Sequence, residues 1–112
     1  DFLERYAYIN LVSPAGPFVS DDTRITIAFW GAGLIYPEHW HGPEELYAVV
    51  AGSARFRATG RAPRDVGVGD FVHHESNQLH ATDMIPGPLL AVIGWKGGEL
   101  LTPPAMDVEQ TV

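Results

Sequence analysis

The sequence predicts an all-β fold of the sandwich or barrel type, and three observations support this prediction. Short runs rich in Val, Ile, Tyr, Phe and Trp are separated by turn residues, because 12 Gly and 9 Pro are spread along the whole chain. Several runs alternate in polarity, as Arg55-Phe56-Arg57 does, which is typical of strands. No window shows a sustained helical period. Many short strands separated in this way favour a closed or double-sheeted architecture.

Each expected strand is an apolar, β-branched run. We expect strands at residues 5–12, 24–30, 46–51, 54–59, 71–74 and 89–95. The first is an N-terminal strand or arm, and residues 103–112, which begin with two prolines, are expected to form a loose C-terminal tail. With 112 residues the chain is long enough for one core and too short for two, so residues 1–112 are expected to form a single domain.

Composition excludes several classes of partner. The formal net charge is −7, from 7 basic and 14 acidic residues, which argues against a nucleic-acid partner because phosphate binding needs a basic face. No apolar run is long enough to span a bilayer, so we expect no membrane partner. There are no cysteines, so any metal must take nitrogen and oxygen ligands. No leader is visible, and we expect a cytoplasmic protein.

Four residues have the types and the spacing of metal ligands. His39 and His41 are two residues apart, so on a strand both imidazoles lie on one face. Glu45 follows a Gly-Pro turn, and we expect the next strand to return antiparallel in a hairpin that brings Glu45 beside the histidines. His80 lies on a later segment and could close the site. Three imidazoles and one carboxylate suit a divalent ion such as Fe, Zn, Mn, Co or Ni.

Two segments resemble the motifs of the cupin superfamily. Residues 33–52 match the first motif at every fixed position, with glycines at both ends and the first three candidate ligands between them. Residues 69–84 keep the spacing of the second motif, which contains His80. Three positions of the second motif differ: Glu75, Asn77 and Met84 stand where Pro, Gly and Asn are usual. The resemblance implies a cupin barrel (a double-stranded β-helix or jelly roll) with the motifs within residues 33–84.

The residues around the ligands resemble the cupin-type dimethylsulfoniopropionate (DMSP) lyases of marine bacteria. The upstream residues 6–22 are also similar, and Trp95 lies fifteen residues beyond His80, as in that family. The similarity is carried mainly by two segments: Tyr36-Pro37-x-His39-x-His41-x-x-Glu44-Glu45-x-Tyr47 and Ser76-Asn77-Gln78-x-His80-Ala81. It implies one divalent metal ion held by His39, His41, Glu45 and His80. It also implies that Tyr47 is the base that removes a proton from the substrate.

The implied chemistry assigns roles to the nearby aromatic residues. The sulfonium group of DMSP needs an aromatic pocket, for which Tyr36 and Trp95 are the candidates and Trp30 and Trp40 are weaker ones. The alternatives are that Tyr47 is a core tyrosine that hydrogen-bonds a ligand, and that Trp95 is ordinary core. The adjacent His73 and His74 cannot both face inward on a strand, and we expect an outer or surface role for them rather than ligation.

The predicted function is therefore a carbon–sulfur lyase that acts on a small molecule, DMSP, and yields acrylate and dimethyl sulfide. A cupin barrel alone does not specify a reaction. The alternatives are another cupin activity, such as a dioxygenase, decarboxylase or sugar isomerase, and a non-catalytic sensor or storage domain. A homodimer formed through a barrel face or the tail is also compatible with the resemblance.

Overall fold

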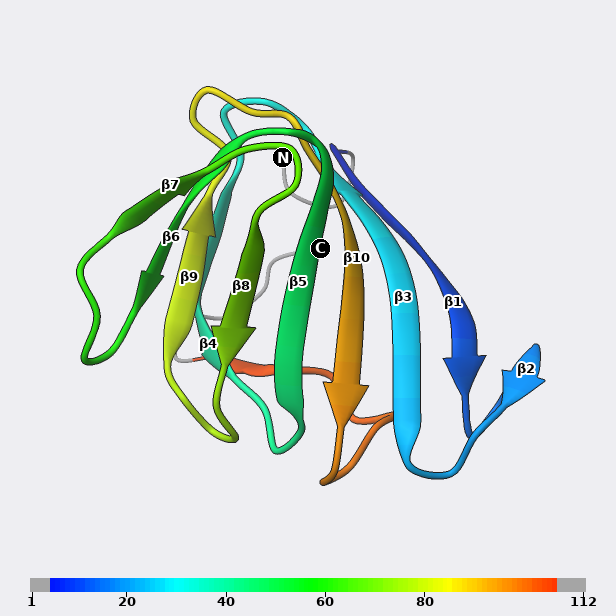
Figure 1. Cartoon of the computed structure of the whole chain (residues 1–112). Helices are drawn as coiled ribbons and strands as arrows, with labels where there is room; N and C mark the ends of the chain where they lie inside the picture. Colours follow the sequence, from blue (N-terminus) through cyan, green and yellow to red (C-terminus); the bar gives the residue numbers. More distant parts are fainter. Residues whose placement is uncertain (1–4, 107–112) are drawn as a thin grey trace.

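The computed structural model describes residues 5–106, and their regular elements are all strands arranged in two sheets (Figure 1). The six-stranded sheet has the order β2-β1-β3-β10-β5-β8 and the five-stranded sheet the order β11-β4-β9-β6-β7. Within the described range, no helix is long and apolar enough to cross a membrane. The strands are β1 (Tyr6–Ser13), β2 (Phe18–Val19), β3 (Thr23–Trp30), β4 (Ile35–Trp40), β5 (Glu44–Gly52), β6 (Ala54–Ala58), β7 (Arg64–Val66), β8 (Phe71–His74), β9 (His80–Asp83), β10 (Leu89–Lys96) and β11 (Ala105–Met106).

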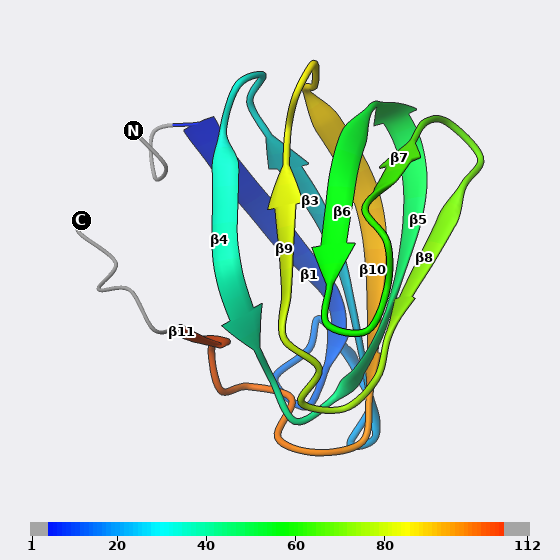
Figure 2. The ribbon, with the colours of Figure 1, turned by 90° about the vertical axis from the view of Figure 1, so that its left-hand side faces the viewer.

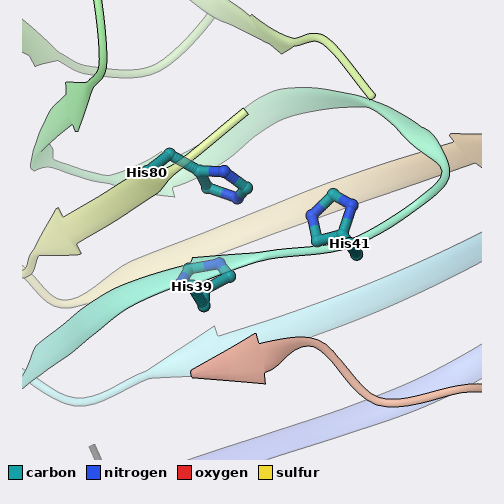
Figure 3. A group of neighbouring side chains, drawn as sticks. All are labelled: His39, His41 and His80. Atoms are coloured by element: carbon teal, nitrogen blue, oxygen red, sulfur yellow. The ribbon is translucent and has the colours of Figure 1, made fainter. Parts of the chain in front are cut away.

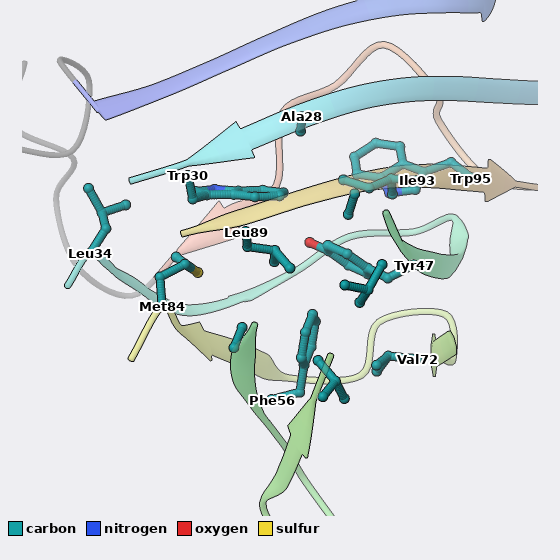
Figure 4. Close-up of a cluster of buried hydrophobic side chains, with 14 of the residues drawn as sticks. Ala28, Trp30, Leu34, Tyr47, Phe56, Val72, Met84, Leu89, Ile93 and Trp95 are labelled. Carbon is teal, nitrogen blue, oxygen red and sulfur yellow. The ribbon is translucent and has the colours of Figure 1, made fainter. Parts of the chain in front are cut away.

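The two sheets face each other and enclose the core (Figure 2). Alternate residues of each strand supply it, as on β10, where Leu89, Ala91 and Ile93 are buried and the intervening residues are not. Figure 4 shows Leu89 and Ile93 projecting into the same core as Phe56, from the five-stranded sheet, and Met84, from the loop after β9. Fully burying a side chain of this size stabilises the fold by about 1.5–3 kcal/mol. The predicted double-sheeted barrel is confirmed.

Gly52, the last residue of the first cupin motif, has a structural reason for being glycine. Its φ is +84°, which L residues with a side chain rarely adopt. A Cβ added there would lie 1.7 Å from the carbonyl oxygen of Pro88. The chain thus leaves β5 by passing close to the start of β10.

One sequence prediction about the fold is wrong. The Gly-Pro turn does not close a hairpin, because β4 pairs with β9 and β11 whereas β5 pairs with β8 and β10. The turn instead carries the chain from one sheet to the other. His39 and Glu45 therefore project into the barrel from opposite sheets. Candidate ligands from two sheets can surround an ion more completely than ligands from one hairpin.

The C-terminal segment is bound to the barrel over its first residues. Ala105 and Met106 pair with Trp40 and His39 on β4, and Pro103 and Pro104 line a cavity described below. The expected loose tail therefore does not begin at residue 103. The rest of that expectation, residues 107–112, lies outside the described residues.

Candidate metal centre

The three predicted histidine ligands converge inside the barrel (Figure 3). His39 on β4 and His80 on β9 are direct partners in the strand register, and their ring centroids are 4.2 Å apart. His41 lies just beyond β4, with its ring centroid 5.0 Å from that of His80. All three are buried, and one ring nitrogen of each lies within 4.8 Å of the other two. The sequence thus predicted a real cluster.

Each of these rings is oriented by a backbone carbonyl two residues away. The Nδ1 atoms of His39, His41 and His80 lie 2.7, 2.9 and 2.7 Å from the carbonyl oxygens of residues 37, 43 and 78. A proton on Nδ1 leaves Nε2 as the free ligand atom, which is how metal-binding histidines are usually held.

The loop that precedes β9 places His80 beside His41. The backbone N–H of Asn77 donates to the carbonyl oxygen of His41 at 2.8 Å, and the Ser76 hydroxyl donates to that of Gly42 at 2.5 Å. Asn77 has a φ of +59°, in the left-handed region that asparagine tolerates better than most residues. The cupin motif has glycine at this position, so the substitution keeps the loop conformation.

Glu45 is the fourth predicted ligand, and a fixed donor holds each of its carboxylate oxygens. Oε1 accepts a hydrogen bond from Nδ1 of His74 at 2.8 Å, and Oε2 accepts one from Nε1 of Trp95 at 2.8 Å. The three residues are neighbours in register across β8, β5 and β10. Nε2 of His80 lies 3.2 Å from Oε1, and Nε2 of His41 lies 3.4 Å from Oε2.

The electrostatics of the group keep Glu45 ionised and His39 neutral, which are the states that bind metal, and favour a protonated His41. Burial raises the pKa of the Glu45 carboxyl, but its contacts with the surrounding histidines outweigh this and hold that pKa well below its usual range. Burial, helped by the neighbouring His80, lowers the pKa of His39 to about 3. Burial also lowers the pKa of His41, but the contact with Glu45 reverses this and leaves it raised.

The residues present fit a bound divalent ion. Nε2 of His41 and Nε2 of His80 are buried and have no hydrogen-bond partner among the described residues. Such orphaned atoms are costly unless something binds them. Nitrogen and carboxylate oxygen donors, in the absence of cysteine, suit the borderline divalent metals. The possible ligand atoms of Glu45, His74 and His80 also lie within 4.8 Å of one another, so His74 adjoins the histidine cluster.

Of the adjacent residues His73 and His74, His74 is the one that faces inward, which the sequence alone did not decide. It is fully buried, with its ring stacked on that of His80 at 3.8 Å. Its neighbour His73 points outward, where Nε2 lies 2.6 Å from the carboxylate of Glu44. The strand parity of β8 separates them as expected, and the alternation with buried Val72 is the signal that identifies His74 as the inward one.

We expect His74→Leu to weaken metal binding by about 10- to 100-fold, the usual cost of losing an outer partner of a ligand. Glu45 then loses the donor to Oε1 and can rotate. His74→Asn, whose amide can replace Nδ1–H, should recover most of the affinity. Competition with a chromophoric chelator measures both. Equal affinities for the two variants and the unchanged chain would contradict this role.

A cavity of about 270 Å³ opens beside the cluster, and it brings the predicted substrate residues to the ligands. Tyr36 stacks on the ring of His39 at a centroid distance of 3.8 Å. The cavity is lined by Tyr6, Tyr8, Arg24, Thr26, Trp30, Tyr36, Glu45, Tyr47, Ile93, Trp95, Leu101, Pro103, Pro104 and Met106. The candidates Tyr36, Tyr47 and Trp95 are therefore all together in one space with Glu45.

Tyr47 is deep in this space, 2% exposed, and its hydroxyl points toward Trp30 and Leu89 (Figure 4). Its ring centroid lies 6.0 Å from that of Trp30 and 5.9 Å from that of His74. Burial, together with the negative charge of Glu45, raises the pKa of its phenol well above the usual value. A positive charge in the cluster would act in the opposite direction.

Trp95 has more contacts than a simple aromatic wall. Besides donating to Glu45, its ring stacks on His41 at a centroid distance of 4.4 Å. The guanidinium carbon of Arg24 lies 4.9 Å from the Trp95 ring centroid, a cation–π contact. The indole therefore links the candidate metal ligands to Arg24, which among residues 5–106 is the one cationic side chain that lines the cavity.

Arg24 is a functional candidate that the sequence analysis missed. Its Nε donates to Oδ1 of Asn10 at 3.1 Å and its Nη1 donates to the carbonyl oxygen of Leu100 at 2.9 Å. No carboxylate among residues 5–106 pairs with it. The sequence does contain a pattern that could have identified Arg24. In β3 the polar residues Arg24 and Thr26 alternate with isoleucines, so the polar residues can all face inward.

Comparisons with known proteins identify the family. The model of the dimethylsulfoniopropionate lyase family matches residues 1–91. The DMSP lyase DddQ of Ruegeria pomeroyi is 41% identical over 106 residues, which are 95% of this chain and 52% of that protein. The chain thus spans about half the length of the curated relative that it matches.

Solved structures agree on the fold. The crystal structure of DMSP lyase DddQ from Ruegeria pomeroyi superposes with a TM-score of 0.88 at 40% identity, covering 96% of this chain and 54% of that one. A cupin superfamily protein from Desulfitobacterium hafniense, 16% identical, gives a TM-score of 0.68 over 82% of this chain and 77% of its own. The fold is therefore that of the cupins, and the chain belongs to the dimethylsulfoniopropionate lyase family.

Proposed function

We propose that the chain is a metal-dependent lyase that cleaves DMSP to acrylate and dimethyl sulfide by a β-elimination that Tyr47 initiates. Membership of the family and the similarity to DddQ support the reaction. The observation that carries the proposal is that a buried phenol, Tyr47, and a buried carboxylate of the cluster, Glu45, line the same cavity. A non-catalytic binding domain would need no such base.

The reaction needs a base on one side of the substrate and an anchor for its carboxylate. The Tyr47 phenolate takes the proton from the carbon next to the carboxylate. The electron pair of that bond forms the double bond of acrylate, and the carbon–sulfur pair leaves with neutral dimethyl sulfide. A divalent ion held by the cluster would supply positive charge that offsets the carboxylate and lowers the pKa of Tyr47. The chain's own residues position the reacting carbon near the phenol.

The cavity is polarised in a way that suits a zwitterion. Glu45 and Arg24 are its charged lining residues, and they lie in one register row of the six-stranded sheet with Trp95 between them. Aromatic rings lie along the opposite strand ends: Trp30 is 5.4 Å from Tyr6 and 6.2 Å from Tyr36, centroid to centroid. We place the sulfonium against these rings, by cation–π attraction, and the carboxylate toward the metal cluster and Arg24.

This arrangement gives different roles to Tyr36 and Trp95, the two residues predicted to bind the substrate. Tyr36, stacked on His39, is next to both the cluster and the aromatic rings, and it contacts the sulfonium in our proposal. Trp95 already contacts a guanidinium, and a second cation on that ring would be repelled by Arg24. Its role is to hold Glu45 and to form the wall of the cavity near the substrate carboxylate.

We expect Arg24→Met to raise KM for DMSP by roughly 10- to 100-fold, the value of a hydrogen bond to a charged group, with a smaller change in kcat. Steady-state kinetics of dimethyl sulfide release measures both constants. Arg55→Met is the matched control, because Arg55 lies on the outer face of β6 and pairs with Asp65. An unchanged KM in a folded Arg24 variant would refute this role.

The test of the proposed function is incubation of the metal-loaded chain with DMSP. We expect dimethyl sulfide in the headspace, detected by gas chromatography, and an equal amount of acrylate in solution, detected by proton NMR. A folded, metal-loaded chain that binds DMSP without releasing either product would indicate a sensor or storage domain. Failure even to bind DMSP would indicate a different cupin substrate.

Two finer points belong to the same proposal. The donor set is compatible with Fe, Zn, Mn, Co and Ni, and we propose one such ion per chain. We also propose a cytoplasmic location, which the lack of cysteine in the sequence supports because the chain does not depend on an oxidising compartment.

A further inference from the structure

A second and smaller pocket, of about 90 Å³, lies at the other end of the five-stranded sheet from the main cavity. The main cavity is lined by residues of β4 and β11, at one end of the strand order, whereas residues of β6 and β7, at the other end, line this pocket (Figure 2). Among the described residues the two cavities have no lining residue in common. The pocket is therefore separate from the space proposed for DMSP.

The pocket lies where the barrel is not closed by backbone pairing. β7 and β8 are the terminal strands of their sheets, and within residues 5–106 no ladder joins them. Two arginine side chains bridge the gap instead. Nη1 of Arg64 donates to the carbonyl oxygen of Phe71 at 2.8 Å, and Nη1 of Arg61 donates to that of His73. A bridge of long side chains leaves more room between two strands than a ladder, whose strands are about 4.8 Å apart.

These two arginines have no acidic partner. No ion pair among the described residues includes Arg61 or Arg64, whereas Arg55 on the adjoining β6 pairs with Asp65 at 2.8 Å. The chain has 14 acidic and 7 basic residues, so two arginines without a carboxylate at one pocket are a notable concentration of positive charge. A guanidinium has five N–H donors, and each of these uses one in its bond to β8. The remaining donors suit an anion, and a carboxylate in particular.

The inner walls of the pocket are apolar. Phe56 and Val72 are buried, at 3% and 4% exposed, and the methyl groups of Ala58 and Ala62 complete the walls. An inorganic anion would lose hydration against these walls and gain no contact in return. A carboxylate with a hydrocarbon tail suits both parts of the pocket, because its charge meets the guanidiniums and its tail displaces water from the apolar walls.

The volume limits the length of that tail. One water in the liquid occupies about 30 Å³, so the pocket has room for roughly three waters or for a tail of about two or three carbons. We propose that the pocket binds a short-chain monocarboxylate, with its carboxylate between Arg61 and Arg64 and its tail against Phe56 and Val72. Acrylate, the product of the proposed reaction, belongs to this class, and only that connection rests on the proposed function.

A layer of aromatic rings separates this site from the main cavity. Tyr47 lines the main cavity, whereas Phe56 and His74 line the pocket, with ring centroids 5.0 and 5.9 Å from that of Tyr47. His74 in turn donates to Glu45. A bound carboxylate would thus contact the outer side of the candidate metal centre without entering the cavity that holds the proposed substrate.

Proton–nitrogen NMR spectra of the zinc-loaded chain, titrated with acrylate, test the proposal. We expect the side-chain Nε–H signals of Arg61 and Arg64 to shift with a dissociation constant of roughly 1–10 mM, as for a small ligand held by exposed charges. Acrylamide, which has the same shape without the charge, should leave them unshifted. The indole N–H signal of Trp95 reports acrylate in the main cavity separately, so the result does not depend on whether the chain cleaves DMSP.

Variants separate the contribution of charge from that of the apolar walls. Arg61→Gln and Arg64→Gln should each weaken binding by roughly 3- to 5-fold, the upper value for an exposed ion pair. Ala58→Leu keeps both charges and fills the pocket, because Ala58 lies two residues after Phe56 on β6 and faces the same side, and it should weaken binding at least as much. Arg55→Gln is the matched control, since it removes a charge outside the pocket and should leave the constant unchanged.

Circular dichroism confirms that each variant is folded. Three results would overturn the proposal: no shift of the two arginine signals, binding that Ala58→Leu leaves unaltered, or chloride that binds as tightly as acrylate. The last of these would indicate an adventitious ion only.

Discussion

Tyr47→Phe is expected to abolish the proposed lyase reaction while leaving the candidate metal centre intact. The substitution removes one oxygen from a side chain that is 2% exposed and leaves the ring packed against Phe56 and Trp30. General-base catalysis contributes about 10²- to 10⁴-fold, so kcat/KM for DMSP should fall by at least that factor. Metal content and melting temperature should change little, because the phenol is not one of the clustered ligand groups.

Tyr8→Phe is the appropriate control, since Tyr8 lines the outer part of the same cavity and is 51% exposed. It should retain most of the activity. Gas release measured on both variants at equal metal occupancy separates the loss of a base from the loss of an ion. A Tyr47→Phe enzyme with undiminished kcat/KM would eliminate this tyrosine as the base, even if DMSP is the substrate.

His80→Ala is expected to remove metal binding, metal-dependent stability and activity together. His80 contributes to both candidate ligand groups, so its loss disrupts each of them. We expect the metal affinity to fall by more than the roughly 100-fold that loss of an outer partner costs. An ion at 1,000 times its Kd stabilises a protein by about 4 kcal/mol, which for a domain of this size corresponds to a melting shift on the order of 15 °C or more.

Thermal melts with and without a chelator measure this effect. The unchanged chain should show the metal-dependent shift, and the His80→Ala chain should melt at the same temperature in both conditions. His73→Ala is the control, because His73 faces outward from β8 and pairs with the exposed Glu44. Full metal-dependent stabilisation of the His80 variant would show that the ion binds elsewhere.

Most of the strands and the clustering of the candidate ligands could be predicted from sequence because both depend on local spacing, although β4 and β9 were not among the expected strands. The runs that became β3 and β10 are recognisable from their β-branched and aromatic residues alone. Because they are two residues apart, His39 and His41 were expected on the same face of a strand. Both side chains do point into the barrel, although β4 ends at Trp40. The short strands β2, β7 and β11 have no distinctive sequence, since two or three residues carry no period.

Other features depend on which sheet a strand joins, and local sequence does not specify this. A Gly-Pro turn looks the same whether it closes a hairpin or crosses between sheets, so Glu45 was expected on the wrong wall. The inward direction of Arg24 also required the structure, because alternation reveals two faces without saying which one is the core. The hydrogen bond from Trp95 to Glu45 depends on the register of β10 with β5.

The central claim is that one ion is bound by the imidazoles of His39, His41 and His80 and the carboxylate of Glu45. X-ray absorption spectroscopy at the edge of the bound metal tests it directly in solution. We expect three imidazole nitrogens and at least one carboxylate oxygen in the first coordination shell, with one imidazole fewer in His80→Ala if any metal remains. A shell composed only of oxygen, or one that His80→Ala leaves unaltered, would contradict it.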